Sequence, residues 1–441
     1  MGSCTQPQRR GFETIRAIAL VHMGGAVSKH DGNAVVPAPN ALADVGPAKE
    51  QSVKAIVQKD ASPRHEPDES SPKFQNMTEA DINKMLGAYT DTSLELSLAR
   101  EADFIGFLAQ HNLPPFDEIP TQVYHLTHLK ELNFSHNHIK SLDSSICELQ
   151  QLEVLDLSSN QLKELPTSLC KLSRLTTLLV SENQLQCLPD DFGSCVALTK
   201  LICFKNQLTT LPDSIGGCIG LEEINLFNNK LTNLGTGFYD LGNLAEVNIA
   251  GNALTQLEPF TKLVKLKRCA AYLNKIKVFP SLTYCKDLVQ VQLYRNALKE
   301  LPDMSDLPNL TELDANTNQI RQIPDTLCST TSALRNLNLR KNRLLSLPPV
   351  IGNLQKLEIL NIGGNPISSP IPSEMESMKC IVSLLLDDSN ITTLPQQMIV
   401  MRTLVRVDLG SRIDHNDKVT HDVIEKLENI CTGNKGWLKQ S

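Results

Sequence analysis

Hydrophobic and polar residues follow one repeated pattern, L-x-x-L-x-L-x-x-N-x-L, along most of this chain. One clear copy runs from Leu152 through Leu155, Leu157 and Asn160 to Leu162. The asparagine is present in the first 11 of 13 copies, and Ser389 and then Arg412 replace it in the last two. A fixed period of 22 to 24 residues predicts a repeat architecture in which each copy is one structural unit. The copies begin at Leu129, Leu152, Leu175, Leu198, Leu221, Leu244, Leu266, Leu288, Leu310, Leu334, Leu357, Ile381 and Leu404.

Each copy predicts a short strand followed by a turn. Residues at the first, fourth and sixth positions would face inward, and stacked repeats would bury them because one repeat cannot do so alone. The asparagine would end the strand with its amide turned inward, where backbone groups of the turn can satisfy it. Many copies continue with Leu-Pro, as at Leu165-Pro166, which fixes the chain where it turns into a short helical turn on the convex side. In the short copies that begin at Leu244, Leu266 and Leu288, we expect a 3₁₀ or extended turn instead.

These elements predict an α/β fold: a right-handed solenoid, or horseshoe, of about 13 repeats with a parallel concave sheet and helical caps at both ends. Thirteen strands about 4.8 Å apart would give a sheet roughly 60 Å long. We expect four segments: a disordered N-terminal region at 1–72, a cap helix and degenerate repeat at 73–128, the solenoid at 129–411, and a C-terminal cap helix and tail at 412–441.

Composition and charge narrow the classes of function. The formal net charge is -7 and there is no long basic run, so nucleic acid is not an expected partner. No apolar stretch reaches the length of about 18 residues that a membrane-spanning helix needs. The 12 cysteines do not form a disulfide pattern, because several recur at equivalent core positions of the repeats. Such cysteines indicate a reducing, intracellular compartment. They include Cys147, Cys170, Cys203, Cys269 and Cys328.

The concave face is the informative surface, because strand positions between the inward leucines point into solvent there. The column directly after the sixth position contains four aromatic residues, and adjacent strands would place Phe204 beside Phe227 and Tyr272 beside Tyr294. Exposed aromatic residues bordered by arginines are typical of binding hot spots. The alternative is that these ladders of like side chains only help neighbouring strands to pack. The residues expected to bind a protein partner, centred on the fourth to eighth strands, are Ile202, Phe204, Phe227, Arg268, Tyr272, Tyr294, Arg295 and Arg340.

The chain start allows three hypotheses. Gly2 and Cys4 resemble an acylation site for myristate and palmitate, although Gln6 stands where serine or threonine is preferred. Met23 begins a better match, in which Gly24 would be acylated if translation starts there. An acyl chain at either site would give peripheral membrane attachment. The third hypothesis is an import presequence, since three arginines and several apolar residues could form a basic amphipathic helix.

Catalytic signatures are missing from the sequence. It contains no GxxxxGK[ST] phosphate loop, no HExxH and no paired CxxC. A cluster of histidines could form a metal site, but metal ligands must converge on one point. We therefore favour the interpretation that these histidines are surface residues of the first turn. These are His125, His128, His136 and His138. We therefore expect a protein that is not an enzyme and has no catalytic residues, no metal and no cofactor.

The period of 23 residues with N-x-L-x-x-L-P resembles the intracellular, Ras-group class of leucine-rich-repeat proteins. That class includes Shoc-type scaffolds, the Ras suppressor and plant intracellular Ras-group proteins. Residues 152–174 (LEVLDLSSNQLKELPTSLCKLSR) carry the resemblance, which covers roughly residues 104–411. It implies a non-enzymatic protein-interaction scaffold in cytoplasmic signalling, held at a membrane if the chain start is acylated. The alternative is a regulatory subunit of a protein phosphatase or a component of a small-GTPase pathway. The matching positions are structural, so they do not name the partner.

Overall fold

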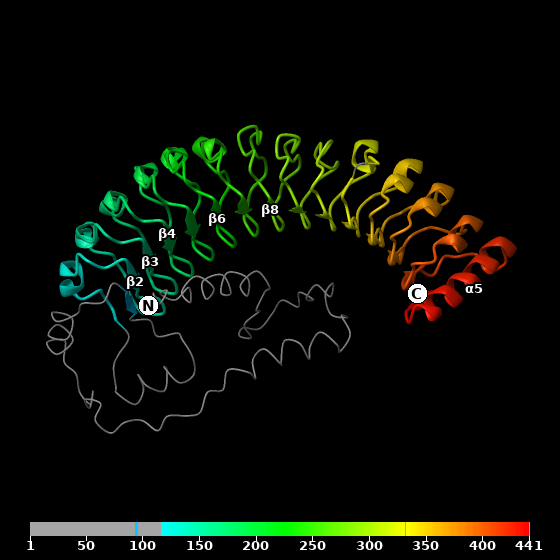
Figure 1. The fold of residues 1–441 in the computed structure, drawn as a ribbon, viewed down its shortest axis with the longest axis horizontal. Coiled ribbons are helices and arrows are strands. Elements are labelled where there is room, and N and C mark those ends of the chain that lie inside the picture. The colour runs from blue at the N-terminus through cyan, green and yellow to red at the C-terminus, as the bar shows by residue number, and fades with distance from the viewer. Residues whose placement is uncertain (1–92, 96–115, 331, 441) are drawn as a thin grey trace, which may run out of the picture. The chain divides into compact units, whose positions relative to one another are not determined.

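The computed structural model describes residues 93–95, 116–330 and 332–440. The chain divides into two units, residues 1–72 and 73–441, and the first unit lies outside the described residues. So do most of the expected N-terminal cap and the three candidate acylation residues, Gly2, Cys4 and Gly24. Within the second unit, strands line the inner side of an arc and short helical turns line its outer side (Figure 1).

Within the described residues, fifteen parallel strands form one sheet in the order of the sequence. The register pairs equivalent positions of neighbouring repeats, so that Leu155 lies opposite both Leu132 and Leu178. Strands β2 to β14 correspond to the 13 predicted copies, and the predicted parallel solenoid is confirmed. The strands are β1 (Ser93–Glu95), β2 (Glu131–Asn133), β3 (Val154–Asp156), β4 (Thr177–Leu179), β5 (Lys200–Ile202), β6 (Glu223–Asn225), β7 (Glu246–Asn248), β8 (Arg268–Ala270), β9 (Gln290–Gln292), β10 (Glu312–Asp314), β11 (Asn336–Asn338), β12 (Ile359–Asn361), β13 (Ser383–Leu385), β14 (Arg406–Asp408) and β15 (Trp437–Lys439).

The outer turns are 3₁₀ helices rather than α-helices. Their first residues commonly follow proline, as at Pro166, whose fixed φ of -70° suits the entry into the turn. The copies that begin at Leu244, Leu266 and Leu288, which are described throughout, contain only turns and bends on this side, as their short spacing predicts. The helices are η1 (Thr121–His125), η2 (Ser144–Glu148), η3 (Thr167–Lys171), η4 (Phe192–Ser194), η5 (Asp213–Gly217), η6 (Thr236–Asp240), η7 (Asp325–Cys328), η8 (Pro349–Asn353), η9 (Ser373–Ser377) and η10 (Gln396–Val400).

One hydrophobic core runs the length of the solenoid, from Ile119 to Cys431. Apolar side chains at the first, fourth and sixth positions of the copies, most of them leucines, face it, and Leu152, Leu155 and Leu157 have no exposed surface. Because the core is continuous, every repeat buries its apolar face against the next one. Stacking therefore supplies the stability that a single repeat of this length lacks.

The repeated asparagines tie neighbouring repeats together. The Asn160 amide nitrogen donates to the Phe134 carbonyl at 2.8 Å, and its oxygen accepts from the Ile139 N–H at 3.0 Å. Equivalent bonds continue along the solenoid as far as Asn365, which confirms that backbone groups satisfy these buried amides. The ladder stops at Ser389, whose buried hydroxyl has no hydrogen-bond partner within the described part of the chain.

The residue before each of these asparagines adopts a left-handed backbone conformation. The φ angle there lies between 52° and 58° at non-glycine residues, including Ser159, Lys205, Leu273 and Arg295. L-residues disfavour this region by roughly 1–2 kcal/mol. The conformation persists because it turns the next side chain, the asparagine, into the interior, where its hydrogen bonds offset the strain.

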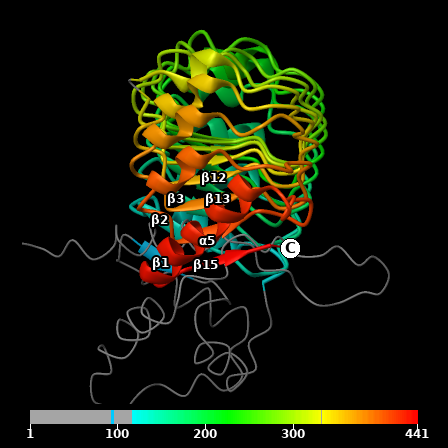
Figure 2. The ribbon, with the colours of Figure 1, turned by 90° about the vertical axis from the view of Figure 1, so that its right-hand side faces the viewer.

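The carboxyl end is closed by a helix and an additional strand. Helix α5 (Lys418–Gly433) begins after Asp417, whose carboxylate accepts the Thr420 N–H at 2.8 Å. It lies in the segment where we expected a cap helix, and it buries Val423 and Leu427. Strand β15 follows and pairs with β14, where the sequence predicted only a tail. Figure 2 shows α5 and β15 together at this end of the solenoid. No helix in the described part of the chain is long and apolar enough to cross a membrane.

Candidate functional site on the concave sheet

Three aromatic side chains on the concave sheet form a row in which each ring contacts the next. The rings of Tyr272 and Tyr294, in adjacent repeats, stack with centroids 4.3 Å apart and planes 8° from parallel. Phe227 packs against Tyr272, with centroids 6.1 Å apart and planes at 44°. The tyrosine pair was expected from the sequence, whereas the contact between Phe227 and Tyr272 was not. We call Phe227, Tyr272 and Tyr294 the aromatic stripe.

The contact between Phe227 and Tyr272 depends on the small residues of the repeat between them. Strands about 4.8 Å apart place residues two repeats apart at roughly 10 Å, so the two rings must lean toward each other. Ala250 occupies the intervening position and is fully buried. Gly251 follows it, and a Cβ there would lie 3.1 Å from the Phe227 ring carbon Cε2. Larger side chains at these two positions would separate the rings.

Burial raises the pKa of both tyrosine hydroxyls. The nearby Asp314 carboxyl also has a raised pKa because of its burial, although it accepts the Asn316 N–H at 3.0 Å and the Asn338 amide at 3.2 Å. The phenols therefore stay neutral across the physiological range. The stripe presents aromatic faces with one polar edge, a combination suited to binding another protein surface.

Apolar side chains extend the stripe on two sides. Ile202 on β5 is 9% exposed, and Phe204 is half-buried with the Lys205 ammonium nitrogen 6.0 Å from its ring centroid. Leu273 directly follows Tyr272 and is 39% exposed, although its φ angle of 54° is unfavourable for leucine. An exposed leucine directly after Tyr272 adds apolar surface beside the aromatic cluster.

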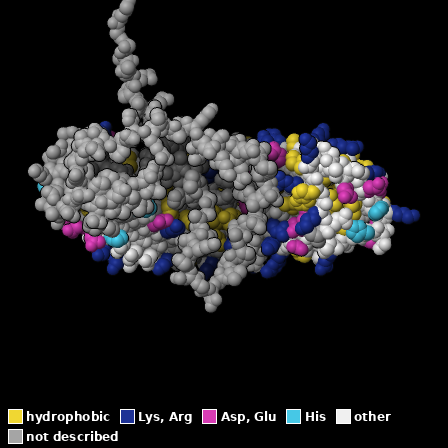
Figure 3. Space-filling model, turned by 90° about the horizontal axis from the view of Figure 1, so that it is seen from below, with side chains coloured by type: hydrophobic (Ala, Val, Ile, Leu, Met, Phe, Trp, Pro, Cys, Tyr) yellow, Lys and Arg dark blue, Asp and Glu magenta, His cyan; other side chains and the backbone are white. Residues whose placement is uncertain are grey.

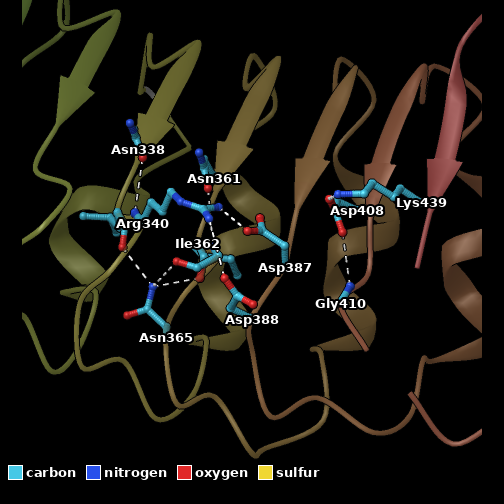
Figure 4. Close-up of polar contacts among 12 residues, drawn as sticks. Asn338, Arg340, Asn361, Ile362, Asn365, Asp387, Asp388, Asp408, Gly410 and Lys439 are labelled. Carbon is cyan, nitrogen blue, oxygen red and sulfur yellow. Dashed lines mark hydrogen bonds and ion pairs between the residues drawn. The ribbon is translucent and has the colours of Figure 1, made fainter. Parts of the chain in front are cut away.

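The three arginines that the sequence selected have different surroundings. Arg268 pairs with Glu246 on the neighbouring strand. Arg295 directly follows Tyr294 and is half-buried. Arg340 lies two repeats beyond Tyr294 and pairs with Asp387, with its other nitrogen 3.7 Å from Asp388. Figure 4 shows the Arg340 side chain reaching across to Asp387. Arg340 thus belongs to a polar cluster of its own rather than to the border of the aromatic stripe.

Polar residues at the fifth position of the repeats have a structural role that the sequence reasoning missed. The Asn133, Asp156 and Asn225 side chains each accept the backbone N–H two residues later, at 2.8, 2.9 and 3.0 Å respectively. This local bond ends the strand as an Asx turn does. A column of Asn and Asp at one repeat position was the signal that could have revealed it. These acceptors are engaged, so the aromatic stripe is the better candidate for contact with a partner.

Most of the described cysteines are packing residues, whereas Cys187 and Cys380 are exposed. All eleven are free, and Cys170, Cys203 and Cys269 are buried. Burial raises the pKa of the Cys203 and Cys269 thiols to about 12, so neither is a thiolate at neutral pH.

No group of three or more His, Cys, Asp or Glu residues could hold a metal ion in the described ranges. A hollow of about 560 Å³ lies between η10 and α5 rather than on the sheet, with Arg402 and Lys426 in its lining.

Figure 3 views the solenoid from the side of the sheet, and hydrophobic side chains are visible there among charged ones.

Two family models agree with this architecture. One described as a leucine-rich repeat region matches residues 116–324, and one described as a leucine-rich repeat matches residues 333–354 and 356–378. The chain is a leucine-rich-repeat protein. None of the curated proteins matches it in sequence.

Solved structures place this leucine-rich-repeat protein among diverse relatives. A leucine-rich-repeat protein of Leptospira interrogans is 26% identical with a TM-score of 0.60, and the match covers 81% of this chain and 98% of that one. The Arabidopsis receptor kinase HAESA, solved with a peptide hormone and a co-receptor, is 27% identical with a TM-score of 0.56. That match covers 66% of this chain and 55% of HAESA.

Proposed function

We propose that this leucine-rich-repeat protein is a non-enzymatic scaffold that binds a protein partner through the aromatic stripe and the apolar residues beside it. The observation that carries the proposal is the stacked pair of Tyr272 and Tyr294, extended by Phe227. Each buried aromatic contributes about 150–250 Å² of contact, so these three with Phe204 would supply at most roughly 600–1,000 Å². One side of a standard protein interface is about 800 Å².

The fold and the relatives support this proposal. Leucine-rich-repeat domains generally serve in protein interaction, and the relative HAESA is a receptor kinase solved with a peptide hormone and a co-receptor. Leu273, which is exposed and directly follows Tyr272, adds support because it extends the apolar surface beside the stripe.

A double substitution tests the proposal. Phe227→Ala with Tyr272→Ala should abolish co-purification of stoichiometric partners from native cells, because it removes the central contacts of the stripe. Tyr284→Ala is the matched control, since Tyr284 is an aromatic residue 55% exposed outside the strands. Circular dichroism should be the same for all three proteins. Undiminished capture by the double variant would refute the proposal.

The finer assignment of pathway rests on the sequence resemblance to the Ras-group class. It supports a cytoplasmic signalling scaffold, or alternatively a regulatory subunit of a protein phosphatase or a small-GTPase pathway component. Peripheral membrane attachment through Gly24 or Gly2 belongs to the same proposal. Mass spectrometry of the native amino terminus distinguishes acylation at Gly24, acylation at Gly2 and Cys4, and a cleaved presequence. A stoichiometric kinase, phosphatase or GTPase among the captured proteins would favour the regulatory role.

A further inference from the structure

Seven cationic side chains gather at the carboxyl-terminal ends of strands β8 to β11. They occupy the eighth, tenth and twelfth positions of four consecutive repeats, where they alternate with inward-facing residues such as Asn274 and Ile276. Six of them are exposed, and Arg295 is half-buried. We call these residues the basic flank: Lys275, Lys277, Arg295, Lys299, Arg321, Lys341 and Arg343.

The basic flank is not neutralised by the described part of the protein. None of its seven members has an ion-pair partner among the described residues. The stretches 272–277, 294–299, 316–321 and 340–345 contain no Asp or Glu. Four strands about 4.8 Å apart confine these charges to roughly 15 Å along the sheet. Neighbouring charges lie within about one Debye length, near 8 Å at physiological salt, so they repel one another.

Three lysines at the opposite, amino-terminal ends of the strands have side-chain partners instead. Lys262 pairs with Asp240 at 2.7 Å, and Lys286 pairs with Asp306 at 2.8 Å. Lys265 donates to the Asn243 amide oxygen at 2.7 Å. Carboxylates therefore neutralise Lys262 and Lys286, while the basic flank has no ion pair among the described residues of a chain whose net charge is -7. This difference indicates that the negative charge that would balance the basic flank comes from a binding partner.

We propose that the basic flank binds an acidic segment of the protein that contacts the aromatic stripe. The two surfaces are continuous in sequence and space, because Arg295 directly follows Tyr294 and Lys275 lies three residues after Tyr272. A polypeptide can follow this path from the curved sheet onto its edge, whereas a flat bilayer cannot enter the concave face. The choice of a polypeptide rests on the proposed function of the stripe.

A fluorescein-labelled deca-glutamate peptide provides a direct probe, with fluorescence anisotropy as the measurement on the full chain. We expect saturable binding that weakens at least about tenfold between 50 and 200 mM NaCl, as contacts between opposite charges require. The variant Lys277→Glu, Lys299→Glu, Arg321→Glu should weaken binding by about tenfold or more, since each reversal replaces attraction with repulsion. If circular dichroism shows that this variant is misfolded, the corresponding glutamine variant replaces it.

The matched control carries the same change of charge at the amino-terminal ends of the strands: Lys262→Glu, Lys265→Glu, Lys286→Glu. Its affinity for deca-glutamate should stay within about twofold of the unaltered protein, because the charges lie at the far end of the strands. The Phe227→Ala, Tyr272→Ala variant should also keep peptide binding, which separates failure of this inference from failure of the proposed function. Absence of saturable peptide binding, or equal loss in both charge-reversal variants, would overturn the inference. Tighter binding to phosphatidylserine vesicles or to a short DNA duplex would overturn it as well.

Discussion

The rings of Tyr272 and Tyr294 lie face to face, with their centroids 4.3 Å apart and their planes 8° from parallel. Burial is the largest cause of the raised pKa of both groups. The stack therefore couples one packing contact of the concave face to the protonation of two phenols. It also makes the candidate site measurable by titration, without knowledge of the partner.

We predict that this pair makes stability depend on alkaline pH. An unfolded tyrosine has a pKa of about 10, and the folded value for Tyr294 is higher. Above pH 10 the unfolded chain has lost protons that the folded chain retains, so the free energy of unfolding falls as pH rises. The contribution is complete below pH 10. Denaturant unfolding of Tyr294→Phe between pH 8 and 11 should therefore show a smaller loss of stability than the unaltered protein.

Buried cysteines with raised pKa, such as Cys203, contribute to alkaline destabilisation in both proteins, so only the difference between them reports on the tyrosine. Absorbance at 295 nm provides an independent readout, in which Tyr294→Phe should lose an ionisation step above pH 10. Identical pH slopes for the two proteins would contradict the assignment of a raised pKa to Tyr294.

We predict that replacing Leu273 raises stability and lowers binding at the same time. Leu273 has a φ angle of 54°, which asparagine and glycine tolerate better than leucine. Leu273→Asn should increase the free energy of unfolding by about 1 kcal/mol. It should also reduce partner capture, because an exposed apolar contact beside Tyr272 is lost. Ser159→Asn, also at a left-handed position, is the control and should stabilise the fold without affecting capture. If Leu273→Asn captures the partner as well as the unaltered protein does, Leu273 has no role in binding.

We predict that the asparagine ladder can be extended by one repeat. Asn365 accepts the Leu344 N–H at 3.0 Å, but Ser389 stands at the next equivalent position with an unpartnered hydroxyl. Ser389→Asn would supply the corresponding acceptor for the Ile367 N–H and should raise the free energy of unfolding by about 1 kcal/mol. Thermal and urea unfolding would measure the change.

Two further variants make this test specific. Ser389→Ala should be nearly neutral, because the hydroxyl has no hydrogen bond to lose. Asn229→Ala, within the ladder, should cost roughly 1–3 kcal/mol because it leaves buried backbone groups unpaired. Destabilisation by Ser389→Asn would mean that the twelfth repeat cannot hold the asparagine geometry.

We predict measurable coupling between Arg340 and Asp387 across the repeat that separates them. Their ion pair passes over Gly363, where a Cβ would lie 2.4 Å from the Asp387 Oδ1 atom. A double-mutant cycle with Arg340→Gln and Asp387→Asn should give a coupling energy of up to about 1 kcal/mol that shrinks in 1 M NaCl. Gly363→Ala should abolish most of this coupling. Additive effects at low salt would show that the pair contributes nothing to stability.

The sequence predicted the fold well because the signal is local and repeated. Each copy places its leucines and its asparagine at fixed spacing, and stacking identical shapes leaves one arrangement that buries them all. The short copies that begin at Leu244, Leu266 and Leu288 even predicted the loss of the outer helix. Strand β15 was not predicted, because Trp437–Lys439 carries no repeat motif and becomes a strand only by pairing with β14.

The candidate site was predicted only in part. Repeat periodicity places Tyr272 beside Tyr294, since equivalent positions of adjacent repeats are always neighbours. It could not predict that Phe227 reaches Tyr272 over Ala250, because that contact depends on the volume of the residue between them. Nor could it assign Arg340, whose direction depends on Asp387 two repeats away and on the space above Gly363.

By itself, then, the sequence determined the repeat, the parallel sheet, the inward asparagines and the column of aromatic residues, because each follows from spacing along the chain. Tertiary structure decided which side chains of that column touch, which arginines are already paired, and that the cations after strands β8 to β11 stand together without ion pairs to any described residue. Those features depend on the length and direction of side chains that come from different repeats. Only the stacked solenoid brings these side chains close enough to touch.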